Sequence, residues 1–137
     1  NCYSLEMGVT TDTGRWIATY PDYPFGLDGH YAPTITRIDI WSHTLQTPEG
    51  IHIGSTLAEL TAAYPNLITG TPGITSKVHW IDGTLGYLVF ETQDPDDGWG
   101  DPGATGPEEV ILIRVVSADV NPDYTVANSG WTADACF

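Results

Sequence analysis

The chain has 137 residues and a formal net charge of −14, because 18 Asp and Glu stand against only 4 Lys and Arg. This deficit of cations excludes nucleic acid and anionic membrane surfaces as partners, since both are bound through clustered Lys and Arg. The length predicts a single domain over residues 1–137. A hydrophobic content of 41%, with five Trp and seven Tyr, gives so acidic a chain enough apolar area to fold.

The first half of the chain predicts two strands. Residues 15–19 form a short candidate strand, and the prolines that follow, from Pro21 on, exclude a regular helix there. Residues 34–42 predict a second strand, because Ile38 and Ile40 alternate with polar residues in a stretch rich in β-branched side chains.

A short helix is predicted between Thr56 and Pro65. Thr56 and Glu59 have the spacing of a capping box, in which each side chain satisfies a free amide of the first turn. Leu60 and Tyr64 follow at helical spacing, and Pro65 prevents continuation. So short a helix is unstable alone, so we expect these two side chains to pack on a sheet.

Three further strands are predicted in the second half. Residues 76–81 and 86–92 flank the turn pair Asp82-Gly83 and predict an antiparallel hairpin. Residues 110–116 are the most apolar run and predict a central strand; Arg114 interrupts the run, which is too short to span a membrane. The fold class is therefore α+β, with an antiparallel sheet of four to five strands and one short helix packed on one face.

Cys2 and Cys136 are the only two cysteines, and each lies one position from an end of the chain. A disulfide between them would close nearly the whole chain and contribute about 4 to 5 kcal/mol in the chain-entropy model. Such a bridge requires an oxidising compartment, so we expect a secreted or cell-envelope protein whose leader has been removed. Two alternatives stay open: a lipidated Cys2, or two unpaired thiols.

The order of strand, capped helix and antiparallel strands resembles that of small exported bacterial proteins of actinobacterial type, many of them lipoproteins without assigned activity. The resemblance covers about residues 35–117. The residues that carry it are Gly50, Ile51, Gly54, Ser55, Thr56, Leu60 and Tyr64, the run from Gly86 to Glu91, and the strand from Val110 to Val116.

More distantly, the chain is similar to outer-membrane-assembly lipoproteins and β-lactamase inhibitor proteins, which bind other proteins. This similarity implies a binding function. Each repeat of the inhibitors carries its own disulfide, whereas the two cysteines here lie at the ends of the chain. Inhibition of β-lactamase is therefore not implied.

An acidic loop separates the last two predicted strands, and seven of the 18 acidic residues fall between Glu91 and Glu109. Carboxylates on a Gly-rich loop are the ligands that calcium prefers, so the 94–101 loop is a candidate calcium site. Its spacing does not match an EF-hand, and a solvated loop extended by charge repulsion is the favoured interpretation. The candidate ligands are Asp94, Asp96, Asp97 and Asp101.

Aromatic residues crowd the N-terminal region. If they are exposed together they would form a platform that stacks on sugar rings or anchors a protein partner. The favoured alternative is that they fill the core. The candidate ligand-binding residues are Trp16, Tyr20, Tyr23, Phe25 and Tyr31.

No catalytic template emerges from the sequence. Glu91 shares a strand side with Tyr87 and Val89, but its place at a strand end favours exposure. There is no Gly-x-Ser-x-Gly motif, and His52 and His79 are interpreted as structural. The favoured function is therefore a non-enzymatic extracellular or cell-envelope module that binds a protein or carbohydrate partner without a cofactor. The alternative is a small secreted hydrolase that uses acidic residues, with calcium bound at the 94–101 loop.

Overall fold

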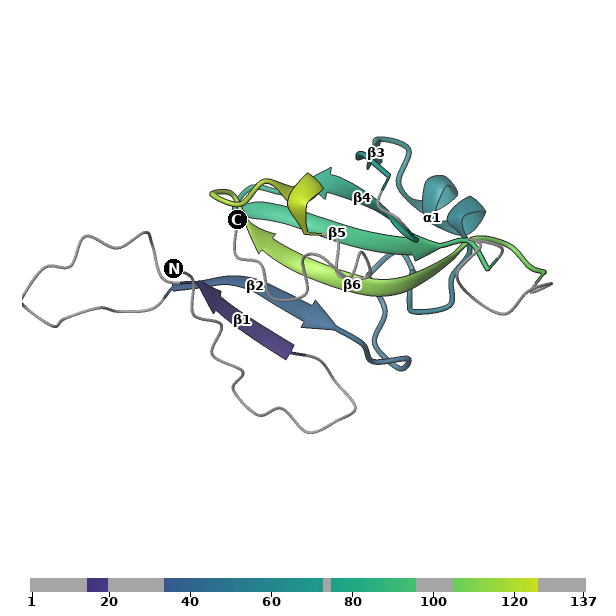
Figure 1. Ribbon diagram of the computed structural model, residues 1–137, viewed down its shortest axis with the longest axis horizontal. Coiled ribbons are helices and arrows are strands. Elements are labelled where there is room, and N and C mark those ends of the chain that lie inside the picture. Colours follow the sequence, from purple (N-terminus) through teal and green to yellow (C-terminus); the bar gives the residue numbers. More distant parts are fainter. Residues whose placement is uncertain (1–14, 20–33, 73–74, 96–104, 126–137) are drawn as a thin grey trace, which may run out of the picture.

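The computed structural model describes residues 15–19, 34–72, 75–95 and 105–125 (Figure 1). Strands account for most of its regular structure. In chain order the elements are β1 (Arg15–Thr19), β2 (Thr34–Ile40), α1 (Leu57–Ala63), β3 (Ile68–Thr69), β4 (Lys77–Asp82), β5 (Gly86–Gln93), β6 (Glu109–Ser117) and the 3-10 turn η1 (Pro122–Tyr124).

The strands form one antiparallel sheet in the order β1-β2-β6-β5-β4-β3. β6, the most apolar strand, lies between β2 and β5, which confirms its predicted central place (Figure 1). The predicted α+β class, with an antiparallel sheet and one helix, is confirmed. Five strands have five to nine residues, and β3 adds a two-residue edge strand that the sequence did not predict.

The register divides the sheet into two faces. Phe90 pairs with His79 on one side and with Ile113 on the other, so these side chains share the surface that we call the Phe90 face. Glu91 and Val89 alternate with Phe90 and point to the opposite side, the Glu91 face.

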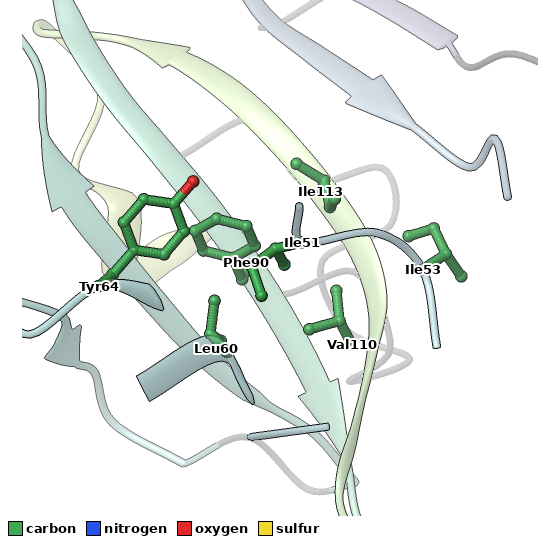
Figure 2. Packing of buried hydrophobic residues seen from close by; sticks show 7 residues of the cluster. All are labelled: Ile51, Ile53, Leu60, Tyr64, Phe90, Val110 and Ile113. Atoms are coloured by element: carbon green, nitrogen blue, oxygen red, sulfur yellow. The ribbon is translucent and has the colours of Figure 1, made fainter. Parts of the chain in front are cut away.

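The main hydrophobic cluster lies on the Phe90 face and includes both apolar side chains predicted for the helix (Figure 2). Leu60 is fully buried, and the Tyr64 and Phe90 rings lie 5.3 Å apart between centroids. The predicted capping box is present, with Thr56 as the N-cap and Glu59 bound back to it. The remaining members of the cluster are Ile51, Ile53, Val110 and Ile113.

A smaller cluster of Val78, Val89 and Val116 occupies the Glu91 face. The turn η1 is tied to the segment after β3, because the Asp123 carboxylate accepts hydrogen bonds from the Thr71 backbone amide at 2.7 Å and its hydroxyl at 3.0 Å. In the described ranges, no helix has the length and hydrophobicity of a transmembrane span.

Candidate functional site

An apolar groove continues the Phe90 face beyond the cluster that contains α1. Ile38, Val115 and Leu88 form a row across β2, β6 and β5, because Val115 is the cross-strand partner of both other residues. With Leu85 from the β4–β5 turn, they line a hollow of about 360 Å³. Val115 is 46% exposed and Leu85 is 88% exposed, so two large aliphatic side chains of the groove face water.

The groove has little free positive charge around it. Among the described residues Arg37 is its one basic lining residue, and both oxygens of the Asp39 carboxylate accept hydrogen bonds from the Arg37 guanidinium, at 2.6 and 2.8 Å. Asp82 and Asp119 are exposed and lie within two residues of groove positions. The groove thus belongs to a chain with a net charge of −14, and its lining arginine is paired with Asp39.

A polar network, the His79 network, lies on the Phe90 face where β3, β4 and β5 meet. The Nδ1 atom of His79 lies 3.0 Å from the Thr69 hydroxyl, and its Nε2 atom lies 2.9 Å from the Thr92 hydroxyl. The Thr92 hydroxyl donates to the Glu108 carboxylate at 2.5 Å, and Lys77 donates to the other oxygen of that carboxylate at 2.8 Å. Four hydrogen bonds thus connect the exposed Thr69 to Lys77 through the buried imidazole of His79.

The network determines the tautomer of His79. Because the Thr92 proton is directed to Glu108, the Thr92 oxygen accepts from Nε2–H, and Nδ1 is left to accept from the Thr69 hydroxyl. Burial lowers the pKa of His79, which is 2% exposed, although the nearby Glu108 carboxylate acts in the opposite direction. Neutral His79 is therefore an acceptor aimed at Thr69.

Glu108 stays ionised in this network. Burial acts to raise the pKa of Glu108, but the hydrogen bonds from Lys77 and Thr92 together with nearby positive charge, chiefly that of Lys77, hold that pKa below its usual value. The carboxylate lies 3.9 Å from Nε2 of His79. A positive charge that develops on the imidazole would therefore be stabilised by a fixed negative charge.

A third cluster, the Arg114 cluster, is buried on the Glu91 face. Arg114, Glu91 and Asp39 are all fully buried; Arg114 donates to Glu91 through Nη2, and its Nε lies 3.2 Å from Asp39. The hydroxyl of Ser76 donates to the second Glu91 oxygen at 2.5 Å. Two carboxylates therefore converge here, but on an arginine between strands rather than on an open cleft.

The structure gives Glu91 a different environment from the one its strand-end position favours. Alternation with Tyr87 and Val89 is as predicted, yet Glu91 is buried rather than exposed. The reason is Arg114 on the neighbouring strand, whose register brings a compensating charge beside it.

Most of the predicted site residues fall outside the described residues. Trp16 lies in β1, opposite Ile38, and Asp94 is exposed after β5. In the part of the chain that the structure describes, no group of three acidic, His or Cys side chains could hold a metal ion. The residues outside the described ranges are Tyr20, Tyr23, Phe25, Tyr31, Asp96, Asp97, Asp101, Cys2 and Cys136.

Sequence reasoning did not identify the members of the His79 network. Thr69 lies in a strand of two residues, and Thr92 and Glu108 come from separate segments that only the register of the sheet brings together. The one available signal was His79 itself, a polar residue inside an apolar strand.

The comparison with protein-family models, with curated proteins and with solved structures finds no match. The proposals below therefore rest on the geometry of the apolar groove, the His79 network and the Arg114 cluster.

Proposed function

We propose that the chain is a binding module of the extracellular space or cell envelope. Its apolar groove docks an extended segment of a protein partner that alternates aliphatic and basic side chains. The observation that carries this proposal is the row Ile38–Val115–Leu88, which continues the hydrophobic face of the sheet beyond α1 and is open to water.

Exposed aliphatic side chains support a docking role because of where they gather. Single exposed apolar residues are common on protein surfaces, but contiguous ones beside a hollow are typical of interaction sites. Val115 and Leu85 both line the same hollow. We propose that α1 covers only one end of the Phe90 face and leaves the groove for a partner.

The charge of the chain selects the kind of partner. With a net charge of −14, and with the exposed Asp82 and Asp119 close to groove residues in the sequence, a basic segment is attracted and an acidic one is repelled. The same repulsion opposes association of two copies through this groove. A carbohydrate is less favoured, because sugar rings stack on exposed aromatic side chains, and the side chains of the groove row are aliphatic.

The test is calorimetric titration with a synthetic peptide of about eight residues that alternates lysine with leucine. We expect binding that weakens with added salt, and no binding of a matched peptide in which glutamate replaces lysine. Equal affinity for both peptides, or no binding of either, would contradict the proposal. Heat released on dilution of the protein alone would point to self-association instead.

Two variants of groove residues and one control variant test whether the peptide binds in the groove. Val115→Thr keeps the β-branched shape and adds a polar atom, and Leu85→Ser removes an aliphatic side chain of the groove that is 88% exposed. Each variant should weaken binding about tenfold. The matched control is Leu45→Ser, because Leu45 is 49% exposed and is not a lining residue of the groove. A control variant that weakens binding as much as Leu85→Ser would place the binding elsewhere.

A further inference from the structure

We propose that Thr69 is the nucleophile of a second, hydrolytic site that acts on carboxylic esters with small acyl groups. His79 is its general base, and Thr92 and Glu108 are positioning residues. This site is separate from the groove, and the inference does not rest on the proposed binding function.

The direction of the hydrogen bonds in the His79 network supports this role for Thr69. Activation of a hydroxyl nucleophile requires a neutral base that accepts its proton and a third group that holds the base. Thr69 donates to Nδ1 of His79, and Nε2–H of His79 is held by Thr92, which in turn donates to Glu108. The hydrogen bonds therefore run from the nucleophile Thr69 through the imidazole of His79 to the carboxylate of Glu108, with the Thr92 hydroxyl between His79 and Glu108.

Exposure to solvent differs sharply along the network. Thr69 lies on the edge strand β3 and is exposed, whereas His79 is 2% exposed and Thr92 is fully buried. Thr69 is therefore the solvent-exposed end of the network, and the substrate ester, like the water that later attacks the acyl-threonine, approaches from this side. Burial lowers the pKa of His79 and keeps it neutral at pH 7, ready to accept a proton.

The reaction follows from this arrangement. The Thr69 oxygen forms a bond to the ester carbonyl carbon as its proton moves to Nδ1 of His79, and the resulting imidazolium lies near Glu108, 3.9 Å from Nε2. The C–O bond to the leaving alcohol then breaks, and Nδ1 returns the proton to the alcohol oxygen. Water attacks the acyl-threonine, with its proton passing through Nδ1 to Thr69, which releases the acid and restores the site.

The experiment uses the full chain with p-nitrophenyl acetate and follows both p-nitrophenol release and the mass of the protein. We expect one acetyl group per chain, mapped to Thr69 by peptide mass spectrometry. Thr69→Val should lower the rate by at least about a hundredfold, while Thr69→Ser should retain activity. The matched control is Thr61→Val, because Thr61 is also exposed but donates only to the Leu57 backbone carbonyl.

The positioning role of Thr92 has its own readout. Thr92→Val removes the link between Nε2 and Glu108, so the pH midpoint of the hydrolysis rate should shift, which a merely structural role would not cause. Circular dichroism and melting curves establish that each variant is folded. An unchanged rate in Thr69→Val, or acetylation at Lys77 in place of Thr69, would overturn the proposal. Peptide binding in the groove by folded Thr69→Val would separate this failure from that of the binding function.

Discussion

The Nε2 atom of His79 lies 2.9 Å from the Thr92 hydroxyl, and the imidazole is the donor in that hydrogen bond. This direction follows from the 2.5 Å bond in which Thr92 donates to Glu108. The hydrogen bond fixes which ring nitrogen carries the proton, while burial lowers the pKa of His79 and favours its neutral form, which links the stability of the sheet to pH.

The first prediction concerns the pH dependence of stability. Burial lowers the pKa of His79 in the folded chain below its usual 6.5, so the unfolded chain binds more protons once the pH falls below that value. The stability from neutral His79 is complete above about pH 6.5 and is lost as the pH falls toward the lowered pKa. Urea unfolding at about pH 7.5 and about pH 5.5 should give a smaller free energy of unfolding at the lower pH.

The controls for this prediction are two glutamine variants. His79→Gln keeps a donor for Thr92 but cannot be protonated, so its free energy of unfolding should change less between the two pH values. His52→Gln is the matched variant for comparison, because it removes an exposed histidine outside the His79 network. A pH dependence that persists unchanged in His79→Gln would contradict the assignment.

The second prediction concerns the Arg114 cluster. Removal of one partner of a buried ion pair leaves an uncompensated charge, so Glu91→Leu alone should destabilise the chain by about 3 to 5 kcal/mol. The double variant Glu91→Leu with Arg114→Met removes both charges and should lose clearly less than the sum of the two single variants. Urea unfolding of all four proteins tests this, and strictly additive losses would show that the pair is not coupled.

The third prediction concerns Tyr64, whose hydroxyl donates to Glu49 at 2.6 Å. Burial and this hydrogen bond raise the pKa of Tyr64 to about 12. The folded chain therefore holds the phenolic proton after an unfolded chain has lost it, so this contribution to stability is complete below about pH 10 and declines as the pH rises toward about 12. Ultraviolet titration should detect one late-ionising tyrosine that is absent in Tyr64→Phe; ionisation of that residue near pH 10 would contradict the prediction.

The fourth prediction concerns Gly86, at the start of β5. A Cβ atom there would overlap the backbone carbonyl oxygen of Val116 on the neighbouring strand, and backbone cannot move aside as a flexible side chain can. Gly86→Ala should destabilise the chain by about 1 to 3 kcal/mol. Gly106→Ala is the matched control, because its Cβ would make an ordinary contact with Pro95 at 3.6 Å. Equal melting temperatures for the two variants would contradict the packing described here.

Local patterns in the sequence were sufficient for most of the fold. The capping box of Thr56 and Glu59, the Asp82-Gly83 turn and the apolar run of β6 each act over a few residues, so each predicts its element directly. β3 was not predicted because a strand of two residues has no periodicity in the sequence. It is a strand only because it pairs with β4.

The candidate sites depended on information that a single sequence does not contain. Thr69, His79, Thr92 and Glu108 come from four separate segments and meet only through the order and register of the strands. The groove likewise depends on β2 pairing with β6, which places Ile38 beside Val115. Alternation along one strand predicted the side of the sheet on which Glu91 lies, but not its ion pair with Arg114 on the neighbouring strand.

The most direct test of the proposed binding function is an NMR titration of the isotope-labelled chain with the lysine-leucine peptide. We expect that amide shifts change at Ile38, Leu85, Leu88 and Val115, and that those of α1 residues such as Ala58 and Thr61 stay unchanged. Shifts that move only at α1, or that do not move at saturating peptide, would contradict the claim that the open end of the Phe90 face is the binding surface.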